Sequence, residues 1–324
     1  MPKRRRVFLL GASGTIGRAT AAALLAKGHE VVCLVRPKAG DPRRGLPDGV
    51  TLRFGDVTDT ASLARDGFAG ERFDALVSCL ASRSGTPKDA WAIDHRAHVD
   101  ALHLAKAAGV TQVVLLSAIC VQRPLLAFQQ AKLAFEAELT ASGLTYSIVR
   151  ATAFFKSLSG QVNRVQAGKP FLIFGDGNLT ACKPISDADL GTYLAECLND
   201  HSRHNRILPI GGPGPAMTPK EQGAALFSLL DQVPKYRSVP VGFLDGIIAV
   251  LSVLGYLSPK LHNKAELARI GRYYATESML VLNPVTGKYD AAATPSAGAD
   301  RLVDHYARLL RGEVKADLGE HAVF

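Results

Sequence analysis

The 324-residue sequence predicts an α/β fold in which a doubly wound parallel sheet is followed by a smaller, mainly helical C-terminal region. Three observations carry this prediction. Apolar strand patterns alternate with helix patterns up to about residue 150, which is typical of a parallel sheet covered on both faces. A glycine-rich turn follows the first strand, and beyond residue 150 helical patterns dominate.

The first strand and the turn after it carry the strongest signal. Residues 6–10 are apolar after Arg6 and run directly into glycines at three-residue spacing, and an alanine-rich helix pattern follows. Gly11 allows the chain to leave the strand, Gly14 allows the backbone to approach a pyrophosphate, and Gly17 allows the helix to pack closely on the sheet. Amides at the start of a helix bind phosphates. The predicted dinucleotide site consists of Gly11, Ser13, Gly14, Thr15, Ile16 and Gly17.

The end of the second strand indicates which dinucleotide binds. Residues 30–35 form this strand, and Arg36 follows where an enzyme that prefers NAD usually carries an acid for the ribose hydroxyls. A guanidinium suits the 2′-phosphate of NADP instead. The alternative is an ordinary solvated arginine, which still leaves this position without an acid. The sequence therefore predicts NADPH as the cofactor.

Two further strand ends contribute to the predicted cofactor site. After the third strand (50–54), Asp56 and the amide of Val57 are placed to meet the adenine ring. For Thr58 and Asp59, a role as N-cap of the next helix is as good an explanation as a role beside the adenine ring. After the fourth strand (74–79), small residues lie against the cofactor at the carboxyl edge of the sheet. We include Cys79, Leu80 and Ala81 in the cofactor site.

The remaining patterns complete the architecture. Strands are expected at 111–117 and 144–150, and helices near 187–198, 218–232, 243–255, 262–275 and 298–311. We expect residues 1–150 to form an NADP-binding domain of the Rossmann type. Residues 151–324 then form a substrate-binding and helical cap region, interleaved with the last strands of the sheet.

The longest apolar segment, 239–257, is broken by proline, glycine and aspartate, and its uninterrupted part is too short to span a bilayer. We expect a buried helix of the cap there. Contact with the substrate, or with a membrane surface, remains the open alternative.

Composition restricts the partners only broadly. The chain has 38 basic and 29 acidic residues, a net charge of +9, which suits nucleic acid, an anionic membrane or an acidic ligand alike. We expect no nucleic-acid partner, and leave peripheral membrane association open. The 5 cysteines are scattered and odd in number, so neither a disulfide framework nor a metal or iron–sulfur site is expected. A reduced, cytoplasmic protein is the simplest interpretation.

The expected catalytic position departs from a known pattern. In short-chain reductases the fifth strand ends in a serine, and the next helix carries Tyr-x-x-x-Lys, with the tyrosine as acid. Ser117 and Lys132 match the serine and the lysine, but Phe128 stands where the tyrosine belongs. A phenyl ring cannot donate a proton to a developing alkoxide, so ordinary ketone or alcohol chemistry is unfavourable. Ser117 has an alternative role in satisfying backbone groups.

From residue 79 onward the sequence closely resembles one family. The matching strings are CLASR (79–83), LSAICVQ (116–122), PLL (124–126), AKL (131–133), YSIVR (146–150), TAFFKSL (152–158), FGDG (174–177), ACKPIS (181–186), GRYYA (271–275) and ESML (277–280). These strings are similar to those of the NADPH-dependent divinyl chlorophyllide a 8-vinyl-reductases, which are atypical short-chain reductases. The resemblance covers nearly the whole chain.

The resemblance implies a magnesium divinyl tetrapyrrole as substrate, divinyl chlorophyllide a or its protochlorophyllide counterpart, whose 8-vinyl group is reduced to ethyl in chlorophyll or bacteriochlorophyll biosynthesis. A vinyl group conjugated to the macrocycle accepts hydride without an oxyanion hole because the ring spreads the charge, which is compatible with Phe128. Lys132 would orient the nicotinamide ribose and relay the proton that follows. The expected substrate-binding residues are Phe128, Phe154, Phe155, Lys156, Cys120 and Lys183.

Other interpretations stay open. Phe154, Phe155, Lys156 and Lys183 fit core packing or solvated charge equally well, and Cys120 fits a buried structural thiol better than a pocket residue. The main rival function is a catalytically silent NADP-binding regulator or assembly subunit of the same fold. An isoflavone-reductase-like enzyme is a third candidate. The flavin and iron–sulfur class of vinyl reductases needs clustered cysteines, which this chain lacks.

Overall fold

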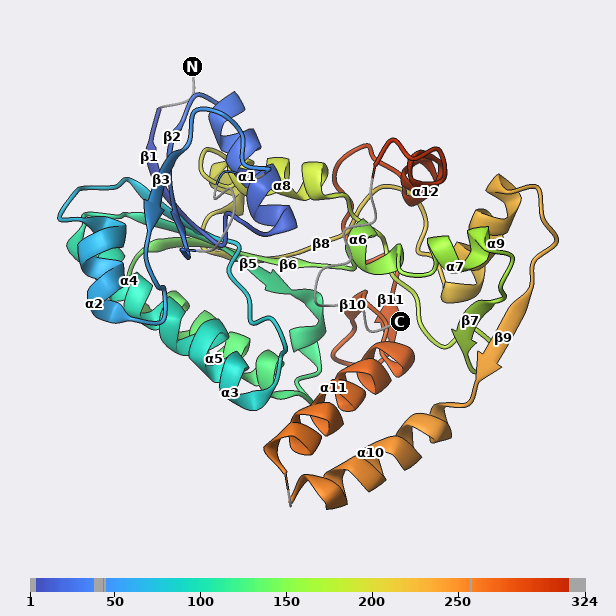
Figure 1. The fold of residues 1–324 in the computed structure, drawn as a ribbon. Helices are drawn as coiled ribbons and strands as arrows, with labels where there is room; N and C mark the ends of the chain where they lie inside the picture. The colour runs from blue at the N-terminus through green and yellow to red at the C-terminus, as the bar shows by residue number, and fades with distance from the viewer. Residues whose placement is uncertain (1–3, 38–42, 44, 257, 315–324) are drawn as a thin grey trace.

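A parallel sheet lies at the centre of the computed structural model, which describes residues 4–37, 43, 45–256 and 258–314 (Figure 1). The strand order is β3-β2-β1-β4-β5-β6-β8. Every neighbouring pair is parallel. The strands are β1 (Arg6–Leu10), β2 (Glu30–Val35), β3 (Thr51–Phe54), β4 (Ala75–Ser78), β5 (Gln112–Ala118), β6 (Thr145–Ala151) and β8 (Arg206–Ile210). The predicted doubly wound sheet is confirmed, and β8 is a strand that the sequence patterns did not single out.

Helices cover both faces of this sheet, because its central strands are apolar on both sides. On one face, α1 (Thr15–Ala26) and α8 (Asp187–Glu196) pack through residues such as Leu24 and Leu190. On the other face lie α4, α5 and a π-helical segment, through residues such as Leu102, Phe135 and Phe68. The elements near this second face are α2 (Thr60–Ser62), the π-helical segment Leu63–Phe68, α3 (Pro87–Ala90), the π-helical segment Trp91–Ala97, α4 (His98–Ala107) and α5 (Ala127–Ala141).

The chain beyond β6, apart from α8 and β8, builds a smaller body beside the carboxyl ends of the strands (Figure 1). Its core joins Phe155, Phe171, Phe227 and Tyr306. A two-stranded parallel pair and a two-stranded antiparallel pair belong to this part of the chain. Its elements are α6 (Phe155–Leu158), α7 (Val162–Gln166), β7 (Phe171–Phe174), α9 (Pro219–Leu229), β9 (Tyr236–Val239), β10 (Val281–Leu282), β11 (Tyr289–Asp290) and α12 (Leu302–Leu310).

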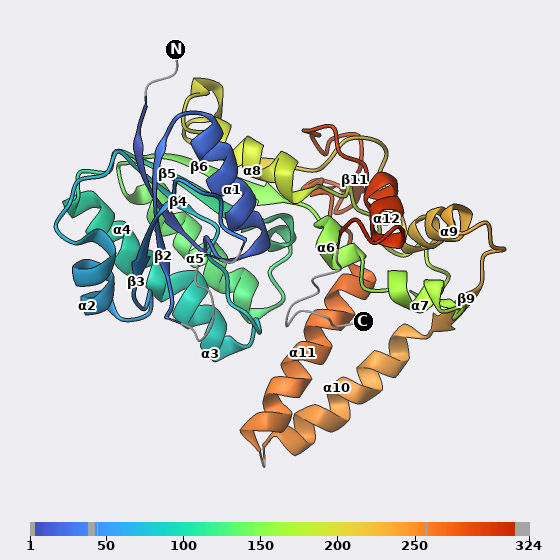
Figure 2. The same cartoon turned by 45° about the horizontal axis from the view of Figure 1, so that its top comes forward.

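Two helices, α10 (Val241–Gly255) and α11 (Pro259–Thr276), form a hairpin that projects from the body (Figure 2). The expected cap helices therefore exist, but the expectation that the segment from residue 243 onward is buried is wrong. No residue of α10 is buried, and among the described elements α11 is the one that packs extensively along it. Among the described residues, no helix combines the length and apolar character needed to cross a bilayer.

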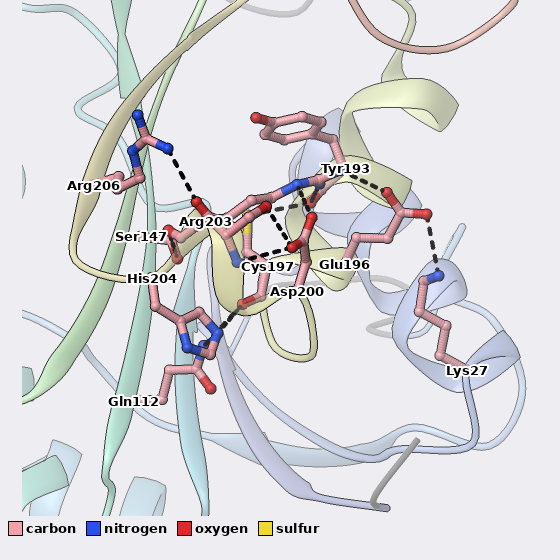
Figure 3. Close-up of polar contacts among 11 residues, drawn as sticks. Lys27, Gln112, Ser147, Tyr193, Glu196, Cys197, Asp200, Arg203, His204 and Arg206 are labelled. Carbon is pink, nitrogen blue, oxygen red and sulfur yellow. Dashed lines mark hydrogen bonds and ion pairs between the residues drawn. The ribbon is translucent and has the colours of Figure 1, made fainter. Parts of the chain in front are cut away.

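A polar cluster ties α8 to α1 and to the sheet at the amino ends of the strands (Figure 3). Lys27 at the end of α1 pairs with Glu196 at 3.3 Å, and Arg203 pairs with both Glu196 at 3.2 Å and Asp200 at 2.9 Å. The Gln112 side-chain amide, at the first residue of β5, donates to the Cys197 carbonyl at 2.8 Å. This cluster lies at the sheet edge opposite to the glycine turn, so we assign it a structural role.

Candidate active site

The glycine turn has the geometry that its sequence predicts. Gly11 has a φ of +75°, and a Cβ there would lie 2.5 Å from the backbone carbon of Cys79. A Cβ on Gly17 would lie 2.1 Å from the Gly11 carbonyl oxygen, so only glycine lets α1 pack this closely on the turn. A Cβ on Gly14 would meet only that same oxygen, at 3.4 Å. Gly14 therefore leaves open space where a ligand can approach.

The start of α1 is free to bind an anion. Gly14 is its N-cap without a side-chain cap, and no acidic residue lies in the first turn. Ser13 is exposed and Thr15 is half-buried, whereas the Ile16 side chain belongs to the core and leaves only its backbone for the cofactor. Unpaired amides and the positive end of the helix are the features that bind phosphates.

Lys156 comes from α6, far along the chain, yet its ammonium donates a hydrogen bond to the Thr15 hydroxyl at 3.1 Å. It thus adds a positive charge to the amides at the start of α1. Lys156 was predicted as a substrate residue, and that role stays an untested prediction.

Arg36 and Asp56 lie beside one another at the carboxyl edge of the sheet. Both are exposed, and the pKa of the Asp56 carboxyl is lowered, mainly by hydrogen bonds from the backbone and hydroxyl of Thr58 and to a smaller extent by Arg36. The Val57 side chain is buried in the core. Asp59 caps α2 by accepting from the Ala61 amide at 3.0 Å, so the alternative reading of Asp59 is confirmed.

The segment after β4 passes directly under the glycine turn, since the Cys79 amide donates to the Leu10 carbonyl at 2.9 Å. The Cys79 side chain turns toward α1, where its sulfur lies 3.4 Å from the Thr20 hydroxyl. Burial raises the pKa of this thiol to about 12, so it stays protonated. Cys79 thus offers its backbone to a cofactor, whereas Leu80 is half-buried and Ala81 is exposed.

Lys132 has a partner that the sequence analysis missed. Its ammonium lies 2.9 Å from the Oδ1 oxygen of Asp94, whose side chain is fully buried, while that of Lys132 is 11% exposed. Oδ1 also accepts from the Ser82 amide at 3.2 Å, and Oδ2 has no hydrogen-bond partner in the described part of the chain. Asp94 belongs to the π-helical segment Trp91–Ala97, and such irregular turns are frequent at functional sites. The sequence around Asp94 mixes acidic, basic and apolar residues (DAWAIDHRAHVD, 89–100), so no pattern there singles out this acid.

Ser117 lies near the end of β5 and directs its hydroxyl toward α5. It donates to Glu136 at 2.5 Å, and the same buried carboxylate pairs with Arg150 on β6, also at 2.5 Å. Glu136 lies on α5 one turn after Lys132. This cluster joins β5, β6 and α5, and the partner of the Ser117 hydroxyl is a side-chain carboxylate, not a backbone group as its alternative role predicted. A catalytic role for Ser117 stays an untested prediction.

A buried histidine, His98, contacts the end of β4 and lies near Lys132. His98 Nδ1 lies 2.8 Å from the Ile93 carbonyl oxygen, so Nδ1 carries the proton, and Nε2 accepts from the Ser78 hydroxyl at 2.8 Å. Burial, helped by the charge of Lys132, lowers the pKa of His98 to about 4. The neutral ring therefore fixes the end of β4, from which the segment at Cys79 begins.

Phe128 lies where a tyrosine acid is expected, but it belongs to an apolar cluster. It packs with Cys120, Leu126 and Tyr273, and the Tyr273 hydroxyl donates to the Cys120 carbonyl at 2.9 Å. Burial raises the pKa of the Cys120 thiol. Cys120 is buried and Phe128 is only 9% exposed, and a substrate role for either residue stays an untested prediction. This cluster docks α11 against the loop that follows β5.

The remaining predicted substrate residues separate in space. Phe154 is half-buried against the core of the sheet, whereas Phe155 is buried in the core of the smaller body, next to the His305 ring. The Lys183 ammonium donates to the Thr294 carbonyl at 2.8 Å and lies 3.2 Å from the Ser296 hydroxyl. Phe155 and Lys183 thus have structural partners, and a substrate role for either stays an untested prediction.

Comparisons with known proteins decide between an enzyme and a silent subunit. The family described as NAD(P)H-binding matches residues 11–201. The divinyl chlorophyllide a 8-vinyl-reductase of Oryza sativa subsp. indica is 47% identical over 100% of this chain and 83% of its own length. That of Zea mays is 48% identical over 98% of this chain and 82% of its own length. The chain belongs to the divinyl chlorophyllide a 8-vinyl-reductase family.

More distant proteins do not change this assignment. The photosystem II assembly factor Ycf39 of Cyanophora paradoxa is 25% identical over 74% of the chain, well below the reductases. An NADPH-dependent quinone oxidoreductase of Escherichia coli, solved with NADPH, is 18% identical, with a TM-score of 0.65 over 94% of this chain and 99% of its own. That likeness shows the shared fold. The predicted class, an oxidoreductase that uses NADPH, is confirmed with the family.

Proposed function

We propose that the protein reduces the 8-vinyl group of 3,8-divinyl chlorophyllide a to ethyl, with NADPH as donor, as its family name describes. The observation that carries this proposal is the full-length identity to the reductases, together with a site that retains Lys132 but has Phe128 in place of a proton-donating tyrosine. A conjugated vinyl group needs no oxyanion donor, so such a site suits it.

The residues present fit a bound dinucleotide. The open side of Gly14 and the uncapped start of α1 receive the pyrophosphate, and Lys156 adds a charge there. Arg36, exposed after β2, is placed for the 2′-phosphate. Asp56 and Val57 then lie at the adenine end. These assignments are proposals that rest on position and charge.

NADPH, when bound, supplies a hydride, which the terminal vinyl carbon of the substrate accepts. Lys132 has one proton engaged by Asp94 and two left, which suits hydrogen bonds to ribose hydroxyls near the reacting carbons. Phe128 and its apolar neighbours keep water away from that side of the loop after β5. The inner vinyl carbon takes its proton from water or from a nearby acid.

We also propose that the enzyme works at the surface of the photosynthetic membrane, since the macrocycle of its proposed substrate has large apolar faces.

The test is direct. Purified protein is incubated in the dark with NADPH and 3,8-divinyl chlorophyllide a, without flavin or ferredoxin, and the pigments are separated by chromatography. Conversion to the 8-ethyl pigment, with one NADPH oxidised per product, supports the proposal. Tight NADPH binding with unchanged pigment, for divinyl chlorophyllide and divinyl protochlorophyllide alike, refutes it and favours the silent-subunit interpretation.

A further inference from the structure

The helical hairpin exposes an apolar face that the rest of the described chain does not cover. Phe243, Val250 and Val253 on α10 are 62%, 59% and 67% exposed, and Tyr256 at the tip is 92% exposed. Phe243, Gly246, Val250 and Val253 follow one another at helical spacing, so they share one side of the helix. A helix that is apolar all round is normally buried. A continuous apolar patch on a surface indicates an interaction site.

The opposite side of α10 is held by α11, which keeps the hairpin rigid. The Asp245 carboxylate pairs with Arg272, and the Ser252 hydroxyl accepts from Arg269 at 2.7 Å. Near the tip the two helices approach closely, because a Cβ on Gly255 would lie 3.0 Å from the Cα of His262. The apolar face is therefore presented on a fixed support.

The charges of the hairpin favour an anionic partner. Its acidic residues are Asp245 and Glu266, and each is paired with an arginine of α11. Lys260 and Lys264, near the tip, are exposed and make no ion pair with the described residues. Exposed lysines beside an apolar helix face are the pattern of helices that lie in the interface of an anionic bilayer.

We propose that the α10–α11 hairpin docks the enzyme on an anionic lipid bilayer, with Phe243, Val250 and Val253 inserted at the interface. The 15 residues of α10 rise about 22 Å, against a hydrocarbon core of about 30 Å, so the helix lies on the bilayer and does not cross it. This inference deepens the proposed membrane location of the enzyme. It is independent of whether the enzyme reduces the pigment.

Flotation with vesicles tests the proposal without any turnover measurement. The protein is mixed with vesicles of phosphatidylglycerol and phosphatidylcholine, or of phosphatidylcholine alone, at low and high salt. We expect it to float with the anionic vesicles and less at high salt. Phe243→Glu with Val253→Glu abolishes flotation. The control Val285→Glu, at a 92% exposed valine in the turn between β10 and β11, leaves flotation unchanged.

The lysines supply the electrostatic part. Lys260→Ala and Lys264→Ala each weaken partitioning to anionic vesicles by about fivefold at low salt. Circular dichroism and the Kd for NADPH show that each variant is folded. Wild-type protein that stays with the soluble fraction overturns the proposal, as does equal flotation of the Phe243→Glu, Val253→Glu variant. A dimer in light scattering that the same variant dissociates overturns it in favour of self-association.

Discussion

Replacement of Lys132 by methionine separates the structural from the catalytic role of this residue. Lys132→Met keeps the length of the side chain but leaves the carboxylate of Asp94 buried without a counter-charge, and Oδ2 of that carboxylate already has no partner among the described residues. Breaking a buried pair by removing one partner costs about 3–5 kcal/mol. We expect a loss of this size in the free energy of unfolding.

A second substitution relieves that loss. Asp94→Asn removes the charge and still offers an oxygen to the Ser82 amide, which donates to Oδ1 in the wild type. In the double variant, Lys132→Met with Asp94→Asn, we expect stability to return to within about 1–2 kcal/mol of wild type, the cost of imperfect hydrogen bonding. Turnover does not return, because the group that orients the ribose is absent.

The assay combines urea denaturation, followed by circular dichroism, with pigment conversion under saturating NADPH. We expect both Lys132→Met variants to lose about 10²-fold in kcat, the usual cost of misplacing the reacting groups when an orienting residue is absent. A free energy of unfolding equal to that of wild type in the single variant would show that the Asp94–Lys132 pair does not stabilise the fold. Recovery of turnover in the double variant would remove Lys132 from the reaction.

Three further outcomes follow from the site. Gly14→Ala is expected to fold normally but to bind NADPH about 10–100-fold more weakly. Gly17→Ala is expected not to fold, because its Cβ would lie 2.1 Å from a backbone oxygen. Equal thermal stability of the two variants would contradict this expectation. Lys156→Met is expected to raise the Kd for NADPH by about tenfold or more. The control Lys169→Met, at an exposed lysine, leaves this Kd unchanged. Isothermal titration of each variant with NADPH measures the two Kd values. Neutral His98, with its pKa lowered to about 4, stabilises the fold fully above pH 6.5 and progressively less as the pH falls toward 4. Wild type should therefore lose about 2 kcal/mol more than His98→Gln between pH 7 and pH 5, and parallel urea titrations of the two would refute it.

The parts of the fold that sequence predicts well are those with local causes. The glycine turn is specified by backbone sterics within Gly11–Gly17, and the structure has the positive φ and the close contacts that these glycines allow. The first six strands match their predicted bounds to within one residue, since continuous apolar runs are a direct consequence of burial on both faces.

What the sequence could not show depends on contacts between distant residues. Asp94 and Lys132 are far apart in the chain, and only the packing of the π-helical segment against α5 brings them to 2.9 Å. Phe154 and Phe155 are neighbours that looked equivalent, yet they belong to different cores because successive side chains diverge where α6 begins. The exposure of α10 could not be read from its apolar pattern, which is the same for a buried helix.

The buried counter-ion of Lys132 restricts what this lysine does in the reaction. An ammonium held at 2.9 Å by a fully buried carboxylate is fixed in place, and transfer of its proton would leave Asp94 as an uncompensated buried charge. Such a lysine suits the orientation of a ribose better than the relay of a proton. Because Phe128 has no proton to give, the proposed mechanism takes the proton for the inner vinyl carbon from water or from a nearby acid. A substrate that spreads negative charge over a macrocycle does not need the directed donor that the developing alkoxide of a ketone requires.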